Sequence, residues 1–329
     1  MLRNMARPPP SPLFVLRGSS GFAHSISFMK CNAGAAEADQ SILATGCSTG
    51  EIYFWNLKTR RVTNTLQGHG KDAVIWVEEY HQNKLISQGR DQSVCIWDVG
   101  EGRQEVIKQL PVSSVSFCKC ALSVEDNGSH MLATPTCEVA TTRLFHLEDG
   151  EPICNLIPDK PESYGMVMCM EWISTHQLLV GYEDGTVALW DSRKQKLLSK
   201  LKLHCEPVMC IDCSSITMEG ISGSVDNSLK LWHIDSTGIS LTKEHELTNA
   251  GLSDIKIRQD NRIFATGGWD SRIRLFTFKK CKPLAVLDYH TESIVSMAFS
   301  SPLPEFDGYR LLAAGAKDNL ISIWSLYQS

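Results

Sequence analysis

The sequence lacks the features that would place it in a membrane or at a strongly charged surface. No uninterrupted apolar run approaches the roughly 18 residues that a transmembrane helix needs, and residues 1–12 have neither the apolar centre of a secretion signal nor the spacing of a mitochondrial one. Neither sign of charge dominates, because 32 Lys and Arg residues stand against 37 Asp and Glu residues. We therefore expect no membrane or nucleic-acid partner, and a cytoplasmic or nuclear location.

Motifs that hold a cofactor or carry out catalysis are missing as well. The sequence has no Gly-rich phosphate-binding loop that ends in Gly-Lys-Ser/Thr, no His-Glu-x-x-His motif and no paired carboxylates in a distinctive setting. The 12 cysteines would stay reduced in this compartment, so their even number does not indicate disulfides. Cys205, Cys210 and Cys213 have spacings typical of a metal site, but Cys213 aligns with Phe117 and Trp172 in strands of other repeats. We expect no metal and no cofactor.

What the sequence does contain is one motif that recurs seven times. Each copy is an apolar stretch, a tight turn and a second apolar stretch that ends in an aromatic residue. These residues are Trp55, Trp97, Phe145, Trp190, Trp232, Phe276 and Trp324, spaced 42 to 48 residues apart. Such spacing is typical of the four-stranded blade of a β-propeller. We predict an all-β fold, with a single seven-bladed propeller over residues 13–329 after a flexible, Pro-rich tail over residues 1–12.

Apolar residues alternate before each aromatic residue, as Ile52 and Phe54 do, with the period of two that is typical of a β-strand. Further strand-like stretches lie upstream in each repeat. We predict that they form the innermost strands of their blades, among them residues 112–117, 167–172 and 294–299.

The last repeat lacks the strand that should follow its aromatic residue. In four other repeats a Leu stands 11 residues after the aromatic residue, as Leu66 does after Trp55, whereas only five residues follow Trp324. Near the start, the stretch LRG at residues 16–18 mirrors LQG at residues 66–68. We therefore predict that residues 13–17 form the outer strand of the last blade, so that the two ends of the chain close the ring.

A short acidic residue recurs at the tight turn of five repeats, where it can accept backbone hydrogen bonds. It lies six residues before the aromatic residue, as Asp91, Asp184, Asp226, Asp270 and Asp318. This pattern resembles the WD-repeat family, in which the Asp bonds a His, the His bonds a Ser or Thr, and that hydroxyl bonds the Trp indole. Two repeats match such a tetrad completely: His69, Ser87, Asp91 and Trp97, and His204, Ser222, Asp226 and Trp232. The fourth and last repeats have Val180 and Ala314 at the hydroxyl position.

The same residue types make up the catalytic triad of a hydrolase, which is the weakest functional alternative. A triad occurs once in a cleft, whereas here the set recurs at matching places in different repeats. We therefore expect a structural role for the tetrads and no enzymatic activity.

The function of a propeller usually resides in the loops at one end. The residue before each tight turn should point out of that end, and Arg90, Glu183, Trp269 and Lys317 hold this position as candidate partner-binding residues. Trp269 is the strongest candidate because Trp is enriched at binding hot spots. The alternative is that its ring lies across a neighbouring blade.

A second short pattern gives an alternative function. Trp190, Asp191 and Arg193 resemble the WDxR box of WD-repeat proteins that dock on a cullin-RING ubiquitin ligase. Because Asp191 and Arg193 share one strand parity, we expect an exposed ion pair between them. In this alternative, the protein is a substrate adaptor that contacts the ligase through Arg193.

Longer stretches resemble the ASTRA-associated subgroup of the WD-repeat family, among them HELTN at residues 245–249, GWDSRIR at 268–274 and ISIWSLY at 321–327. This resemblance implies a non-catalytic scaffold that acts with co-chaperones in the maturation and stability of phosphatidylinositol-3-kinase-related kinases. G-protein β subunits, also WD-repeat proteins, pair with γ through a long N-terminal helix. The prolines at positions 8, 9, 10 and 12 oppose such a helix, so we expect protein partners but no G-protein γ subunit.

Overall fold

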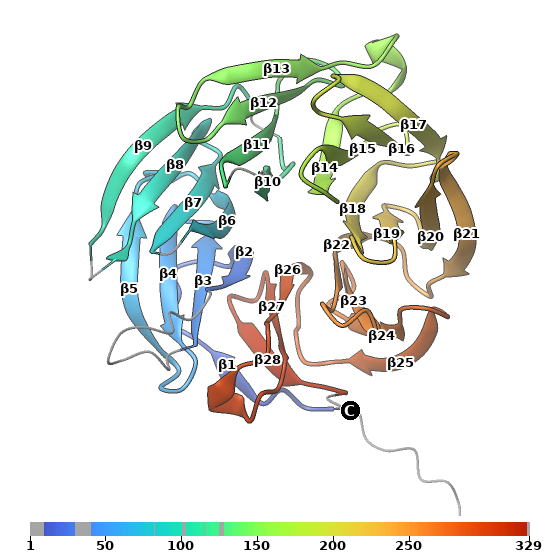
Figure 1. Ribbon diagram of the computed structural model, residues 1–329. Helices are drawn as coiled ribbons and strands as arrows, with labels where there is room; N and C mark the ends of the chain where they lie inside the picture. The colour runs from blue at the N-terminus through green and yellow to red at the C-terminus, as the bar shows by residue number, and fades with distance from the viewer. Residues whose placement is uncertain are drawn as a thin grey trace, which may run out of the picture.

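The computed structural model describes residues 10–29, 41–81, 83–100, 103–114, 116–124 and 128–327. Its strands form seven four-stranded antiparallel sheets, arranged as blades around a central axis (Figure 1). The predicted all-β, seven-bladed propeller is therefore confirmed. The predicted tail stays a prediction, because residues 1–9 lie outside the described residues.

Six blades are built from four consecutive strands that run in order from the axis outward. Their strands are β2 (Ala23–Phe28), β3 (Ile42–Cys47), β4 (Glu51–Asn56) and β5 (Arg61–Gln67); β6 (Val74–His81), β7 (Lys84–Gly89), β8 (Ser93–Asp98) and β9 (Glu105–Pro111); β10 (Ala121–Val124), β11 (His130–Pro135), β12 (Thr142–His146) and β13 (Pro152–Leu156); β14 (Val167–Trp172), β15 (Gln177–Tyr182), β16 (Thr186–Asp191) and β17 (Lys196–Lys202); β18 (Val208–Cys213), β19 (Glu219–Ser224), β20 (Ser228–Asp235) and β21 (Gly238–Glu246); and β22 (Leu252–Ile257), β23 (Ile263–Gly268), β24 (Ile273–Thr277) and β25 (Lys282–Leu287). Within the described residues, helical structure is limited to two 3-10 turns, Pro161–Ser163 and Pro304–Phe306. None of the described helices has the length and hydropathy to cross a membrane.

The seventh blade joins the two ends of the chain. It contains β26 (Ile294–Phe299), β27 (Leu311–Ala316) and β28 (Ile321–Ser325), and its outer strand is β1 (Phe14–Leu16). β1 and β28 pair antiparallel, with Leu16 opposite Ile321, and they lie side by side at the bottom of Figure 1. Leu16 is buried. The predicted closure of the ring by the N-terminal strand is thus confirmed.

The innermost strand of the third blade differs from the prediction. β14 and β26 coincide with the predicted ranges 167–172 and 294–299, but β10 begins at Ala121 rather than at residue 112. Upstream of β10, Ser114 Oγ accepts the N–H of Ser116, and Ser116 Oγ accepts the N–H of Cys118. These local side-chain bonds take up backbone donors that a strand would use. Phe117 is consequently exposed, and its alignment with the strand residue Cys213 is wrong.

The core lies between neighbouring blades. One apolar cluster, for example, joins Ile52 and Phe54 of the first blade to Leu85 and Trp97 of the second. A sheet covered on both faces in this way can be apolar on both faces, and each fully buried Leu, Ile or Phe stabilises the fold by about 1.5–3 kcal/mol. The five repeat tryptophans are at most 2% exposed.

A buried arginine ties the end of the described chain to the sixth blade. Arg258 pairs with Asp260 at 2.9 Å and donates hydrogen bonds to the carbonyl oxygens of Leu326 and Tyr327 at 3.0 and 2.9 Å. The residues after β28 are therefore held in place by a side chain of a neighbouring blade.

Candidate protein-interaction site

The tetrad of the second blade is a continuous chain of hydrogen bonds. His69 Nδ1 lies 3.0 Å from Asp91, His69 Nε2 lies 2.8 Å from Ser87 Oγ, and the Trp97 indole N–H donates to the same hydroxyl at 2.8 Å. His69, Ser87 and Trp97 are almost completely buried. A substrate cannot reach the Ser87 hydroxyl, so these residues connect strands and do not form a reactive centre.

The tetrad of the fifth blade is incomplete, which corrects the sequence prediction. His204 lies 2.9 Å from Ser222 Oγ and 3.4 Å from Asp226, but the buried Trp232 Nε1 has no hydrogen-bond partner in the described structure. Burial lowers the pKa of His204, against the opposing effect of Asp226.

The residue opposite Trp232 explains why its indole N–H lacks a partner. β19 carries Gly220 at this position. A Cβ at Gly220 would lie 2.0 Å from the indole, so the ring packs directly on the glycine backbone. In the other four blades with a repeat tryptophan, the paired residue is a leucine: Leu43, Leu85, Leu178 and Leu312. We attribute the missing hydrogen bond to Gly220, on which the Trp232 indole packs where the other four blades place a leucine.

Two blades that lack the tetrad hydroxyl replace it from another position. In the last blade Ser322 Oγ lies 2.7 Å from His290 Nε2 and accepts the Trp324 indole N–H at 2.8 Å. In the fourth blade the Trp190 indole N–H donates to Tyr182 Oη at 3.2 Å. The sequence pattern does not reveal either hydroxyl, because neither lies ten residues before the aromatic residue, where Ser87 and Ser222 lie.

The sixth blade replaces the histidine partner of its turn aspartate. Arg274 and Asn249 donate hydrogen bonds to Asp270, at 2.6 and 2.7 Å for the closest contacts. Both residues belong to stretches quoted from the sequence, HELTN and GWDSRIR. These bonds lower the pKa of the Asp270 carboxyl, although burial opposes them.

The candidate partner-binding residues of the turns are exposed, but they do not all lie at one cavity. The Trp269 ring packs on the backbone of Gly251, in the loop that leads into its own blade, and is 45% exposed. Lys317 lies at the same cavity as Trp269. Arg90 lies over the ring of Phe117 at 4.6 Å. Glu183 lies apart from the cavity and accepts the N–H of Met166 at 2.9 Å.

A cavity of about 540 Å³ opens at this end of the central channel. We call it the mouth cavity. Its apolar wall is formed by Ile75, Phe117, Met168, Met209, Trp269 and Val295. Four of these residues stand second in the innermost strand of their blade, where the side chain points into the channel. Phe117 and the methionines were not recognised in the sequence as site residues, because only the ring brings them together.

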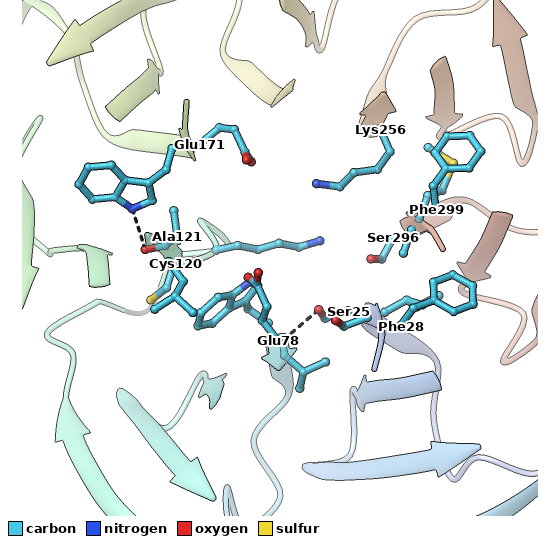
Figure 2. A pocket seen from close by; sticks show the side chains of 18 of the residues that line it. Ser25, Phe28, Glu78, Cys120, Ala121, Glu171, Lys256, Ser296 and Phe299 are labelled. Carbon is cyan, nitrogen blue, oxygen red and sulfur yellow. Dashed lines mark hydrogen bonds between the residues drawn. The ribbon is translucent and has the colours of Figure 1, made fainter. Parts of the chain in front are cut away.

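Charged side chains line the channel, and Glu171 and Lys256 border the mouth cavity as well. Figure 2 shows Glu78, Glu171 and Lys256 directed toward the centre of a second cavity of about 420 Å³. Burial raises the pKa of Glu171 to about 8, against the effect of Lys256. Burial lowers the pKa of Lys256, but the carboxylates of Asp254, Asp212 and Glu171 outweigh it and raise that pKa above its ordinary value.

Two of these carboxylates connect neighbouring blades. Asp212 accepts the N–H of Ile257 at 2.6 Å, and Asp254 accepts the N–H of Met297 at 2.7 Å. These bonds join the innermost strands around the channel. Within the described residues, no group of three or more His, Cys, Asp or Glu side chains is arranged to hold a metal ion.

Arg193 lies at the other end of its blade. β16 runs from the tight turn of Asp184 to Asp191, so the turn that contains Arg193 is opposite the mouth cavity. The predicted ion pair between Asp191 and Arg193 is wrong, because Asp191 accepts the backbone N–H of Lys194 at 2.9 Å and lies 3.7 Å from its Nζ. The strand ends at Asp191, and the strand parity therefore does not continue to Arg193.

The sequence matches known proteins over nearly its whole length. The family described as "WD domain, G-beta repeat" matches residues 156–191, 195–233, 239–277 and 281–325. The chain is 40% identical to guanine nucleotide-binding protein subunit beta-like protein 1 of Mus musculus over 97% of both chains. It is 24% identical to ASTRA-associated protein 1 of Schizosaccharomyces pombe, over 97% of this chain and 99% of the relative. For ASTRA-associated protein 1 of Aspergillus flavus, the identity is 23% over 98% of both chains.

Proposed function

The chain belongs to the WD40-repeat family, and on that premise we propose that it is a non-catalytic scaffold that binds protein partners at its mouth cavity. The observation that carries this proposal is the exposure of Trp269 and Phe117 at the rim of an apolar cavity. Large aromatic side chains beside a concave apolar surface are the residues that most often dominate binding energy. The buried tetrads, in contrast, offer no reactive group to a substrate.

The finer part of the proposal concerns the partners. Relatives of the chain are named ASTRA-associated protein 1, and the stretches HELTN, GWDSRIR and ISIWSLY resemble the same subgroup. We propose that the scaffold acts with co-chaperones in the maturation of phosphatidylinositol-3-kinase-related kinases, in the cytoplasm and nucleus. An exposed Arg193 leaves the substrate-adaptor alternative open to a separate test.

Affinity purification of the tagged full chain from cells, followed by mass spectrometry, tests this function. We expect recovery of co-chaperone components and of the kinases, with loss of both on Trp269→Ala. Tyr309→Ala is the matched control, because Tyr309 is an aromatic residue with the same 45% exposure, in the loop between β26 and β27 at the opposite end of the ring. Recovery of neither class by the unmodified chain overturns the kinase role. Equal recovery with both variants overturns the role of the mouth cavity.

A further inference from the structure

A group of cations lies on the sixth blade, at the end of the ring opposite the mouth cavity. β24 runs from the tight turn of its blade to Thr277, so the turn that follows it, residues 278–281, is at that opposite end. Lys279 and Lys280 are exposed in this turn, and Lys282 is exposed where β25 begins.

Two more exposed cations lie against this turn. The carbonyl oxygen of Arg262 accepts the N–H of Phe278 at 2.8 Å, so Arg262 lies directly beside the turn. Lys243, on β21 of the fifth blade, donates from Nζ to the carbonyl oxygen of Lys280 at 2.7 Å. The cations of this surface, which we call the basic patch, are Lys243, Arg262, Lys279, Lys280 and Lys282.

The acidic residues next to the basic patch in sequence are each paired with another cation. Asp260 accepts two hydrogen bonds from the buried Arg258, at 3.0 and 2.9 Å. Glu244 pairs with Lys230. Within the part of the chain that the structure describes, the three lysines of residues 279–282 form no ion pair. Cations therefore outnumber carboxylates at this surface even when both acidic residues are counted.

The corresponding turns of two other blades are also basic, but their cations contact partners within the protein. In the fourth blade, Lys194 Nζ lies 3.7 Å from Asp191, the last residue of β16. In the first blade, the Arg60 guanidinium lies over the ring of Phe14, 4.8 Å from its centre. The last residue of β24 is instead Thr277, which carries no charge. The basic patch thus lacks the carboxylate that partly neutralises the turn of the fourth blade.

An exposed aromatic ring borders the basic patch. Tyr327 is 40% exposed, and its hydroxyl donates to the carbonyl oxygen of Leu284 at 3.2 Å, two residues after Lys282. Pro283 is exposed between them. Cations beside an exposed aromatic ring match a protein segment that carries carboxylates and an apolar side chain. A nucleic acid or an anionic membrane would also meet the rest of the chain, whose net charge is −5.

We propose that the basic patch is a second interaction surface, which binds an acidic segment of a partner protein. Asp and Glu side chains of the segment contact the lysines of the patch, and an apolar side chain packs on Tyr327. Opposite charges at such a surface accelerate association and add specificity. This proposal goes beyond the proposed function, because a site at the other end of the ring leaves the scaffold free to hold two partners at once.

Selection from a display library of random peptides on the full chain tests this proposal. Peptides that also bind Lys280→Glu/Lys282→Glu are removed, so that only binders of the basic patch remain. We expect these peptides to be rich in Asp and Glu. A selected peptide with a fluorescent label should bind about tenfold more weakly, or worse, to Lys279→Glu, a variant not used in the selection. Lys279→Arg keeps the charge and should keep the affinity.

The matched control changes the net charge elsewhere. Lys194→Glu/Lys196→Glu adds the same negative charge as Lys280→Glu/Lys282→Glu, but at the corresponding turn of the fourth blade, and should leave the affinity unchanged. A peptide that loses as much affinity with this control as with Lys280→Glu/Lys282→Glu responds to net charge alone, which overturns the basic patch. Melting curves of the variants exclude unfolding as the cause of lost binding.

The remaining results identify other occupants or none. Peptides without an excess of Asp and Glu overturn the acidic partner, and a selection that leaves no peptide overturns the proposal. Duplex DNA or phosphatidylserine vesicles that bind in place of peptides, and lose binding with Lys279→Glu, overturn it in favour of another class of partner. Dimers in light scattering that disappear with Lys279→Glu do so in favour of a second copy of this chain. None of these results affects the mouth cavity, which Trp269→Ala tests separately.

Discussion

His290 Nε2 lies 2.7 Å from Ser322 Oγ, although Ser322 is not at the tetrad position of the last repeat. That position holds Ala314, which pairs with Ser322 across β27 and β28. The hydroxyl of the second blade comes instead from Ser87 on β7, the second strand of its blade. A hydroxyl from either of two adjacent strands can therefore complete the link between histidine and tryptophan.

Replacing Ser322 should destabilise the last blade. Ser322→Ala leaves the Trp324 indole N–H and His290 Nε2 buried without this partner, which should cost about 1–3 kcal/mol of unfolding free energy. Urea unfolding measures the change. Adding Ala314→Ser in the same chain should restore part of the loss, because it supplies the hydroxyl from the tetrad position. Ser301→Ala, at an exposed site, serves as the control, and equal stability of Ser322→Ala and this control would refute the link.

The tetrads of the second and fifth blades, which both match the family pattern in sequence, should respond differently to loss of the indole N–H. Trp97→Phe removes a buried hydrogen bond to Ser87, whereas Trp232→Phe removes none. We expect Trp97→Phe to be the more destabilising change, by roughly 1 kcal/mol or more. Chemical denaturation of the two variants side by side is the measurement. Equal losses would contradict the explanation based on Gly220.

Closure of the ring depends on a short N-terminal strand. Leu16 is 1% exposed in the last blade, so Leu16→Ala should cost about 2–5 kcal/mol and lower the melting temperature of the whole propeller. Leu13 is 49% exposed, and Leu13→Ala should change stability by less than about 0.5 kcal/mol. Scanning calorimetry compares the two. A Leu16→Ala protein that melts like the Leu13→Ala protein would show that β1 is dispensable.

The channel should make stability depend on pH through Glu171. Its pKa rises from an ordinary value of 4.5 to about 8 in the folded protein. Between these values the folded state holds a proton that the unfolded state has released, so stability falls as pH rises across this window. Glu171→Gln cannot ionise and should lose less stability over the same range.

Urea midpoints near both ends of the window measure this dependence. The charges of Lys256, Asp212, Glu78 and Asp254 act on Glu171, so the comparison with the unmodified chain isolates the contribution of Glu171. Glu206→Gln, at an exposed site, is the control and should leave the slope with pH unchanged. Parallel curves for the Glu171 variant and the unmodified chain would rule out the raised pKa.

The substrate-adaptor alternative depends on Arg193. If the chain docks on a cullin-RING ubiquitin ligase through this residue, Arg193→Ala should abolish recovery of the ligase adaptor in affinity purification. We expect instead that any recovery is the same with and without the substitution, because Asp191 is bonded to Lys194 and does not orient the Arg193 side chain. Selective loss of the ligase adaptor with Arg193→Ala would favour the alternative.

Local pattern made much of the fold predictable. The strands of the aromatic repeats, the seven blades and the pairing of β1 with β28 all follow from the period of two and from the spacing of Trp55 to Trp324, since each blade repeats one local pattern. The innermost strand of the third blade was predicted at the wrong residues. The side-chain hydrogen bonds of Ser114 and Ser116 compete with strand formation there, and the pattern of apolar residues does not show such bonds.

The sequence alone therefore determined the architecture of this protein, because a propeller blade is specified by residues close together in the chain. Tertiary structure alone decided which groups meet across strands and blades. It placed Ser322 beside His290, set Trp232 on Gly220, and brought Phe117 and Trp269 to one cavity. Such contacts depend on distances of a few ångströms between residues far apart in sequence, which only the packing of the closed ring fixes.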